Sequence, residues 1–221
     1  MISKKVVLLF LSKYYLLKNL KNIDMNETIK TIYERRAVRK YDERPIEKAL
    51  INEVIEAGRM APSAINMQPW KFYVLTNKEL INRLSKEIAR AAAGEISKME
   101  IRKLMKLAAS FFYLSHGLDF LKLDDAVFHG APAVIFISSP KTNEWADLDI
   151  GMCSQNIMLA AQSLGLASCP IGFAKYVEKT KSYKKLGIAE TEQVIIAVII
   201  GYGLEKPEPK IRLKDNLFFI E

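Results

Sequence analysis

The segment of residues 193–202 constrains the fold most, because seven of its ten residues are Val, Ile or Ala. Such a continuous apolar run is typical of a strand that is buried on both faces of a sheet. Residues 133–139, bounded by Pro132 and Pro140, predict a buried strand, and the aromatic and β-branched residues of 70–76 predict a short strand.

Helical patterns occupy much of the remaining chain. Residues 46–58 place apolar side chains at helical spacing, with Pro45 expected in the first turn. Residues 149–164 predict another helix, which ends before Gly165, where a left-handed residue is expected. Residues 78–118 are also mostly helix-forming. We therefore predict an α+β fold with a central mixed, mainly antiparallel sheet flanked by helices.

Charge and cysteine usage narrow the functional class. The net charge of +8 is shared equally between residues 1–25 and residues 26–221, so the body is only mildly basic. It carries no motif of sequence-specific nucleic-acid binding, and we expect no nucleic-acid partner. Cys153 and Cys169 are the only cysteines and look like structural thiols, which favours a reducing cytoplasm.

Residues 1–25 form an extension ahead of one expected domain, residues 26–221. Its lysines interrupt the apolar run, no cleavage pattern follows, and its longest uncharged run is too short to span a membrane. We interpret the extension as a packing helix, or as sequence upstream of a second start at Met25, and expect no membrane contact. A basic binding protein acting through the extension is an alternative from another class, which deletion of residues 1–24 would test.

Two segments carry groups suited to a phosphorylated heterocycle. Residues 35–39, R-R-A-V-R, hold three guanidinium groups, which form fixed bidentate hydrogen bonds to phosphate. By themselves they also fit a solvated charged turn. Residues 61–70, A-P-S-A-I-N-M-Q-P-W, form a proline-braced loop that is able to present Ser63 and Asn66 to a planar ring. A structural turn beside a core tryptophan is the alternative.

The order of these segments resembles the nitroreductase family. R-R-A-V-R-K-Y, a proline-led helix and A-P-S-A-I-N-M-Q-P-W-K-F are similar to its amino-terminal signature. D-I-G, L-G-L, C-P-I-G-F, G-Y-G and I-R-L are similar to its second half. The resemblance covers residues 27–221. It implies an interlocked homodimer with two FMN sites at the subunit interface, each built from both chains.

The resemblance also implies which residues hold FMN. Along the ribityl phosphate and the ring edge it places Arg35, Arg36, Ala37, Arg39, Lys210 and Arg212. The residues that would meet the flavin ring from the partner subunit are Pro62, Ser63, Ala64 and Asn66. The other side of the ring would be lined by Pro170, Ile171 and Gly172. Ala37 stands where a serine is common in the family, which removes one hydroxyl donor.

The implied activity is transfer of hydride from NADH or NADPH through FMN to a nitroaromatic, a quinone or a similar small oxidant, by a ping-pong mechanism. The flavin is the reactive group, so no catalytic side chain is expected. A flavin reductase, a reductive dehalogenase or a flavin-destructase-like enzyme is the alternative within the fold. Residues 91–130, where the family varies most, match no subgroup. His116 and His129 have no partners at metal-site spacing, so no metal is expected.

Overall fold

The computed structural model describes residues 26–96, 125–213 and 215–221. The extension and most of the variable stretch, including His116, lie outside these residues. The chain divides into two units at residues 34 and 35, and α2 (Glu27–Glu34) belongs to the first.

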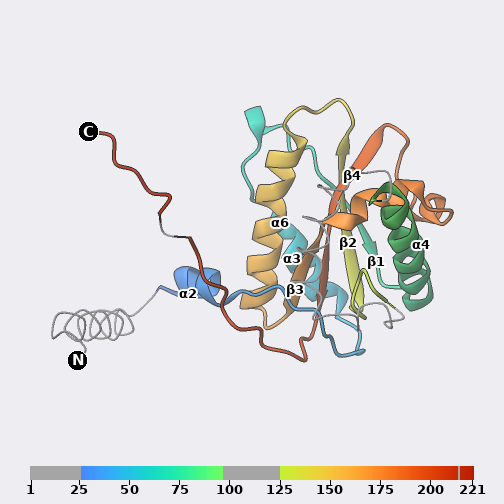
Figure 1. Ribbon diagram of the computed structural model, residues 1–221, viewed down its shortest axis with the longest axis horizontal. Helices are drawn as coiled ribbons and strands as arrows, with labels where there is room; N and C mark the ends of the chain where they lie inside the picture. Colours follow the sequence, from blue (N-terminus) through green and yellow to red (C-terminus); the bar gives the residue numbers. More distant parts are fainter. Residues whose placement is uncertain (1–25, 97–124, 214) are drawn as a thin grey trace, which may run out of the picture. The chain divides into compact units, whose positions relative to one another are not determined.

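The second unit carries the sheet and its covering helices (Figure 1). Its elements, in chain order, are α3 (Lys48–Arg59), the 3-10 turn η1 (Ala64–Asn66), β1 (Lys71–Leu75), α4 (Lys78–Ile96), β2 (Ala133–Pro140), α6 (Ala146–Ser163), β3 (Ala167–Ile171), the 3-10 segments η3 (Gly172–Lys179) and η4 (Tyr183–Leu186), and β4 (Glu192–Gly201). The strand order is β1-β2-β4-β3, and each neighbouring pair is antiparallel. A parallel bridge joins Ala37, which lies outside the named strands, to Ser168 of β3.

The two long strands lie in the middle of this sheet, as their apolar runs predict. Alternate side chains enter two cores. Ile135 and Val198 pack with α3 and α6 on one face, and Phe136 and Ile199 pack with α4 and η3 on the other. Figure 1 shows α3 and α6 on one side of the strands and α4 on the opposite side. The predicted α+β class is confirmed, and among the described helices none is long and apolar enough to cross a membrane.

Close contact between α3 and α6 depends on a glycine. A β-carbon at Gly58 would lie 2.7 Å from Ile157 Cγ1 and 3.3 Å from Cys153 Sγ.

Both cysteines, Cys153 and Cys169, are buried and form no disulfide, and burial raises the pKa of Cys153 to about 12. Both cysteines are therefore buried, as the sequence predicted.

Three boundaries differ from those expected. Pro45 lies before α3 and outside its first turn, because the helix begins at Lys48 after an extended Glu47. The helix α6 begins three residues earlier than predicted, at Ala146. The sequence did not predict β3, whose five residues include a proline; Pro170 is tolerated because β3 is an edge strand of the named sheet. Gly165 adopts the expected left-handed conformation, with φ of 74°.

The buried carboxylate of Glu192 links β1, β2 and β4 at the end of the sheet where β4 begins. Glu192 is 2% exposed and accepts hydrogen bonds from Tyr73 Oη at 2.9 Å and Ser138 Oγ at 2.6 Å, and it pairs with Lys71. Burial by itself raises the pKa of Glu192, but hydrogen bonds from Lys71, Ser138 and Tyr73 together outweigh that effect and lower it below the usual 4.5.

The ionised Glu192 should therefore make stability depend on acid pH. A lowered folded-state pKa gives stability that is fully present above about pH 4.5 and is lost as the pH falls through the folded-state pKa. We expect Glu192→Gln to flatten the decline of the free energy of unfolding below pH 4.5, measured by urea titration at several pH values. Glu190→Gln, an exposed residue on the adjoining turn, is the control. An unchanged acid limb in Glu192→Gln would show that this network does not contribute to it.

Candidate functional site

The arginine segment is held between β3 and the chain that follows β4. The Val38 amide donates to the Ser168 carbonyl at 3.1 Å, beside the parallel bridge of Ala37. On the other side, Tyr41 forms an antiparallel bridge with Gly203, and the Arg39 amide donates to Glu205 Oε1 at 2.6 Å. Two motifs that are far apart in sequence, R-R-A-V-R-K-Y and G-Y-G, are therefore neighbours.

The glycines of G-Y-G permit this close approach. A β-carbon at Gly201 would lie 2.6 Å from Pro132 Cδ and 2.7 Å from the Tyr41 ring. At Gly203 it would lie 2.9 Å from Ala167 Cβ. The buried Tyr41 hydroxyl donates to the Val38 carbonyl at 2.7 Å and closes the turn of the segment. Tyr41 and Glu205 therefore shape the segment; the sequence pattern gives no signal for either role.

The guanidinium groups form a positive cluster, in which Arg35 has an unsatisfied donor. Arg35, Arg36 and Arg39 are half-buried, and Arg35 Nη1 is buried without a hydrogen-bond partner among the described residues. Burial is the main cause of a lowered pKa for Arg35, and the charges of Arg36 and Arg212 lower it further. The tail residue Arg212 thus lies within electrostatic range of the arginine segment. The arrangement favours binding of an anion there.

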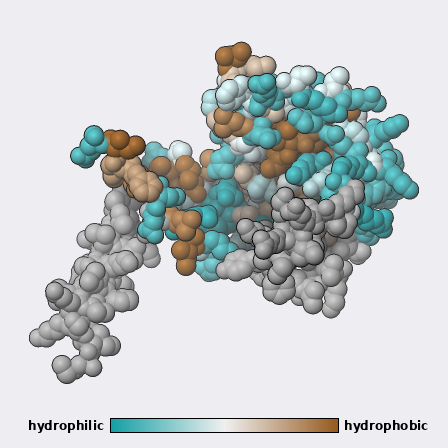
Figure 2. Space-filling model, turned by 45° about the horizontal axis from the view of Figure 1, so that its top comes forward, coloured by the Kyte–Doolittle hydropathy of each residue, from teal (hydrophilic) through white to brown (hydrophobic). Residues whose placement is uncertain are grey.

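The tail itself is exposed. Lys210 and Arg212 are both exposed, although Arg212 acts on the charge of Arg35. The tail also exposes large apolar side chains, namely Leu204, Ile211, Leu213, Leu217, Phe218, Phe219 and Ile220. Figure 2 shows hydrophobic residues at the molecular surface in several places. Exposed apolar side chains in this number are typical of a segment that a partner covers.

The proline-braced loop adopts a defined and strained shape. Ile65, Asn66 and Gln68 have positive φ values of 45°, 58° and 47°. The Gln68 amide donates to Ser63 Oγ at 2.9 Å, and the Ala64 amide donates to Asp149 Oδ1 at 3.1 Å. Non-glycine residues with such φ values concentrate at binding sites.

The third predicted group continues from β3 into η3. Pro170 and Gly172 are exposed, whereas Ile171 is buried in the core. A β-carbon at Gly172 would meet nothing within 4 Å, so the space beside its backbone is open. Backbone groups of this turn are therefore accessible to a ligand.

These groups do not all meet within one chain. Along β4, Val194 pairs with Ser138, which pairs with Lys71 after the loop, whereas Ile200 pairs with Ser168 beside the arginine segment. Six residues of strand span about 20 Å, and β1 and β3 are about 14 Å apart across the sheet. Figure 1 shows the loop with η1 near one end of α6 and the arginine segment near the other.

A hollow of about 420 Å³ lies between the loop and α6. Pro62 lines it together with six residues of α6, namely Asp147, Leu148, Gly151, Met152, Gln155 and Asn156. Leu148 is 56% exposed, and a β-carbon at Gly151 would meet nothing within 4 Å. This face of α6 is therefore open and partly apolar.

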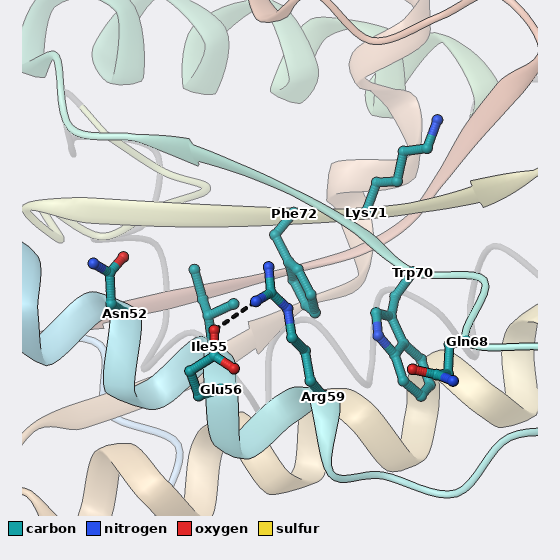
Figure 3. Close-up of a pocket in the computed structure, with 8 residues that line it drawn as sticks. All are labelled: Asn52, Ile55, Glu56, Arg59, Gln68, Trp70, Lys71 and Phe72. Atoms are coloured by element: carbon teal, nitrogen blue, oxygen red, sulfur yellow. Dashed lines mark hydrogen bonds and ion pairs between the residues drawn. The ribbon is translucent and has the colours of Figure 1, made fainter. Parts of the chain in front are cut away.

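A second hollow, of about 610 Å³, lies between α3 and the start of β1 (Figure 3). None of the predicted site residues lines it. Arg59 lies beside the Phe72 ring and pairs with Glu56, so its charge is already compensated. The geometry of this second hollow therefore gives no reason to place a bound anion there. Within residues 26–96, 125–213 and 215–221, no group of three or more His, Cys, Asp or Glu side chains is arranged to hold a metal ion.

Comparison with known proteins agrees with this geometry. Residues 32–202 match the profile of the Nitroreductase family. A 4-nitrobenzoate reductase of Pseudomonas putida is 30% identical over 196 residues, covering 79% of this chain and 84% of that protein. Crystal structures of FMN-bound nitroreductases from Bacteroides fragilis and Desulfitobacterium hafniense superimpose with TM-scores of 0.72 and identities of 26% and 27%; each alignment covers 89% of this chain and 100% of the other.

The antiparallel sheet between two helical layers defines an α+β protein, with a cluster of basic side chains beside β3. The chain belongs to the nitroreductase family.

Proposed function

We propose that this protein is an FMN-dependent oxidoreductase that uses NADH or NADPH to reduce a nitroaromatic, a quinone or a similar small oxidant by a ping-pong mechanism. When bound, FMN would supply the hydride chemistry that links the nicotinamide to the oxidant. The related proteins from Bacteroides fragilis and Desulfitobacterium hafniense bind FMN, and the one from Pseudomonas putida is a 4-nitrobenzoate reductase. We expect a cytoplasmic location.

The observation that carries this proposal is the unsatisfied Arg35 guanidinium. Burial of an N–H donor without a hydrogen-bond partner costs free energy. The cost is higher when the donor is a cation beside other cations. A dianionic phosphate ester would supply the missing acceptor and offset the repulsion from Arg36 and Arg212. The residues present therefore fit the phosphate of FMN.

The chain's own residues would bind and orient the cofactor. Arg35, Arg36 and Arg39, with Lys210 and Arg212 from the tail, would hold the phosphate, beside the methyl group of Ala37. The other side of the flavin ring would be lined by Pro170, Ile171 and Gly172. A backbone N–H of this turn, which Pro170 lacks, would donate to the central-ring nitrogen that carries the hydride. A fixed donor there would polarise that nitrogen toward accepting a hydride.

The separation of the two site halves supports a homodimer. The arginine segment and the loop with Pro62, Ser63, Ala64 and Asn66 lie at opposite ends of the sheet in one chain. One flavin would contact both groups if a second chain supplied the loop. The open face of α6 and the exposed apolar side chains of the tail provide surface for that second chain.

The test measures the cofactor and the oligomeric state of the same preparation. We expect the purified protein to be yellow, to release FMN rather than FAD on heating, and to scatter light as a dimer at micromolar concentration. FAD is not expected because the basic cluster suits a terminal phosphate and no dinucleotide fingerprint is present. Release of FAD, or a monomer with full flavin occupancy, would contradict the proposal.

A further inference from the structure

The loop of residues 61–69 holds a conformation that its own sequence does not favour. Ile65, Asn66 and Gln68 lie in the left-handed region, which is especially unfavourable for the β-branched Ile65. Such residues remain in place only where the surrounding contacts determine their conformation. The contacts that hold this loop are therefore important to whatever it binds.

Contacts within the loop explain part of its shape. Ser63 Oγ accepts the Gln68 amide at 2.9 Å, and Gln68 Nε2 donates to Asn66 Oδ1 at 3.1 Å. The Asn66 amide donates to the Ser63 carbonyl at 3.0 Å. These bonds close the loop on itself, but they do not fix its position relative to the rest of the protein.

Asp149 supplies a contact from outside the loop. Its Oδ1 accepts the Ala64 amide at 3.1 Å, across 85 residues of sequence. The side chain is 0% exposed, and Oδ2 has no hydrogen-bond partner among the described residues. A buried carboxylate with one unsatisfied oxygen is unfavourable for folding, although its place in the first turn of α6 offsets some of that cost.

We propose that Asp149 is a positioning residue, which fixes the loop against α6 in the conformation that meets the flavin of the second chain. This inference rests on the proposed function. Pro62 from the loop and Leu148, Gly151 and Met152 from α6 line the same hollow. The hydrogen bond from the loop to Asp149 therefore fixes the loop against the helix face on which the second chain would lie. A single position of the loop would then serve both the subunit contact and the flavin contact.

The test uses the full chain with Asp149→Ala, Asp149→Asn and the control Glu144→Ala, which changes an exposed acidic residue just before α6. In the flavin-free protein, we expect Asp149→Ala to speed hydrogen exchange of the Ala64 amide by about tenfold or more. We expect its FMN dissociation constant to rise about tenfold, because the loop must then be ordered on binding. Asp149→Asn keeps an acceptor oxygen and should restore both values to within about threefold of wild type.

The possible results distinguish failure of the Asp149 inference from failure of the proposed function. A melting temperature that falls in Asp149→Ala without any change in FMN affinity would show that Asp149 is only structural and overturn the inference. Unchanged exchange at Ala64 would overturn it as well, as would failure of Asp149→Asn to restore FMN affinity. Wild-type protein that does not bind FMN would instead refute the proposed function, and the flavin role of Asp149 with it.

Discussion

Replacing Arg35 by methionine is expected to weaken FMN binding and, at the same time, to leave the flavin-free protein as stable as wild type or more stable. Loss of a charge-assisted hydrogen bond is typically worth about 1.5 to 3 kcal/mol, which corresponds to roughly ten- to a hundredfold in affinity. In the free chain, however, the substitution removes a buried donor without a partner and a charge repelled by Arg36 and Arg212. Titration calorimetry of the flavin-free protein and its thermal unfolding measure the two effects.

Two matched variants separate the site from general charge effects. Arg212→Met should weaken FMN binding to a similar degree but leave thermal stability unchanged, because Arg212 is exposed. Arg83→Met, on the exposed face of α4, should change neither quantity. If Arg35→Met binds FMN as tightly as wild type, the phosphate does not lie at the arginine segment. If Arg35→Met destabilises the flavin-free protein, Arg35 has a structural partner in solution.

Mixing two inactive variants is expected to restore flavin binding. Arg35→Met damages the phosphate half of the site, and Ala64→Trp blocks the loop half while keeping the Ala64 amide that donates to Asp149. At an FMN concentration a few times the wild-type dissociation constant, each homodimer should bind much less FMN than wild type. If each site combines two chains, a hybrid dimer contains one undamaged site, so random subunit exchange should restore binding to about a quarter of the sites. Equilibrium dialysis after co-refolding counts these sites.

The control mixes Arg35→Met with Arg212→Met. Both residues act in the same half of the site, since Arg212 lies within electrostatic range of Arg35 in one chain. A hybrid of these two variants then contains no undamaged site, and no binding should return. Restoration in this control would show that the tail serves the partner's site. Failure to restore binding between Arg35→Met and Ala64→Trp would contradict a site composed of two chains.

Several elements are predictable from local sequence because their signal is local. The runs at 133–139 and 193–202 have a composition that is typical of buried strands, and they form β2 and β4 with bounds within one residue. The helical spacing of 46–58 predicts α3, and the small and apolar residues of 149–164 predict most of α6. The order of the motifs indicates the family, which the comparison with known proteins confirms.

The tertiary structure alone decided how these elements meet, because pairing between strands depends on hydrogen bonds between residues that are distant in sequence. The short segment A-S-C-P-I carries no strand pattern, yet as β3 it receives the arginine segment at Ser168. Glu192 lies one residue before its predicted strand and becomes the acceptor for three other side chains. Asp149 opens a predicted helix, but only packing against the loop makes its buried carboxylate the acceptor for Ala64. The sequence by itself therefore determined most of the elements, the family and the kinds of residue at the site, whereas long-range hydrogen bonds and burial decided which of those residues stand together.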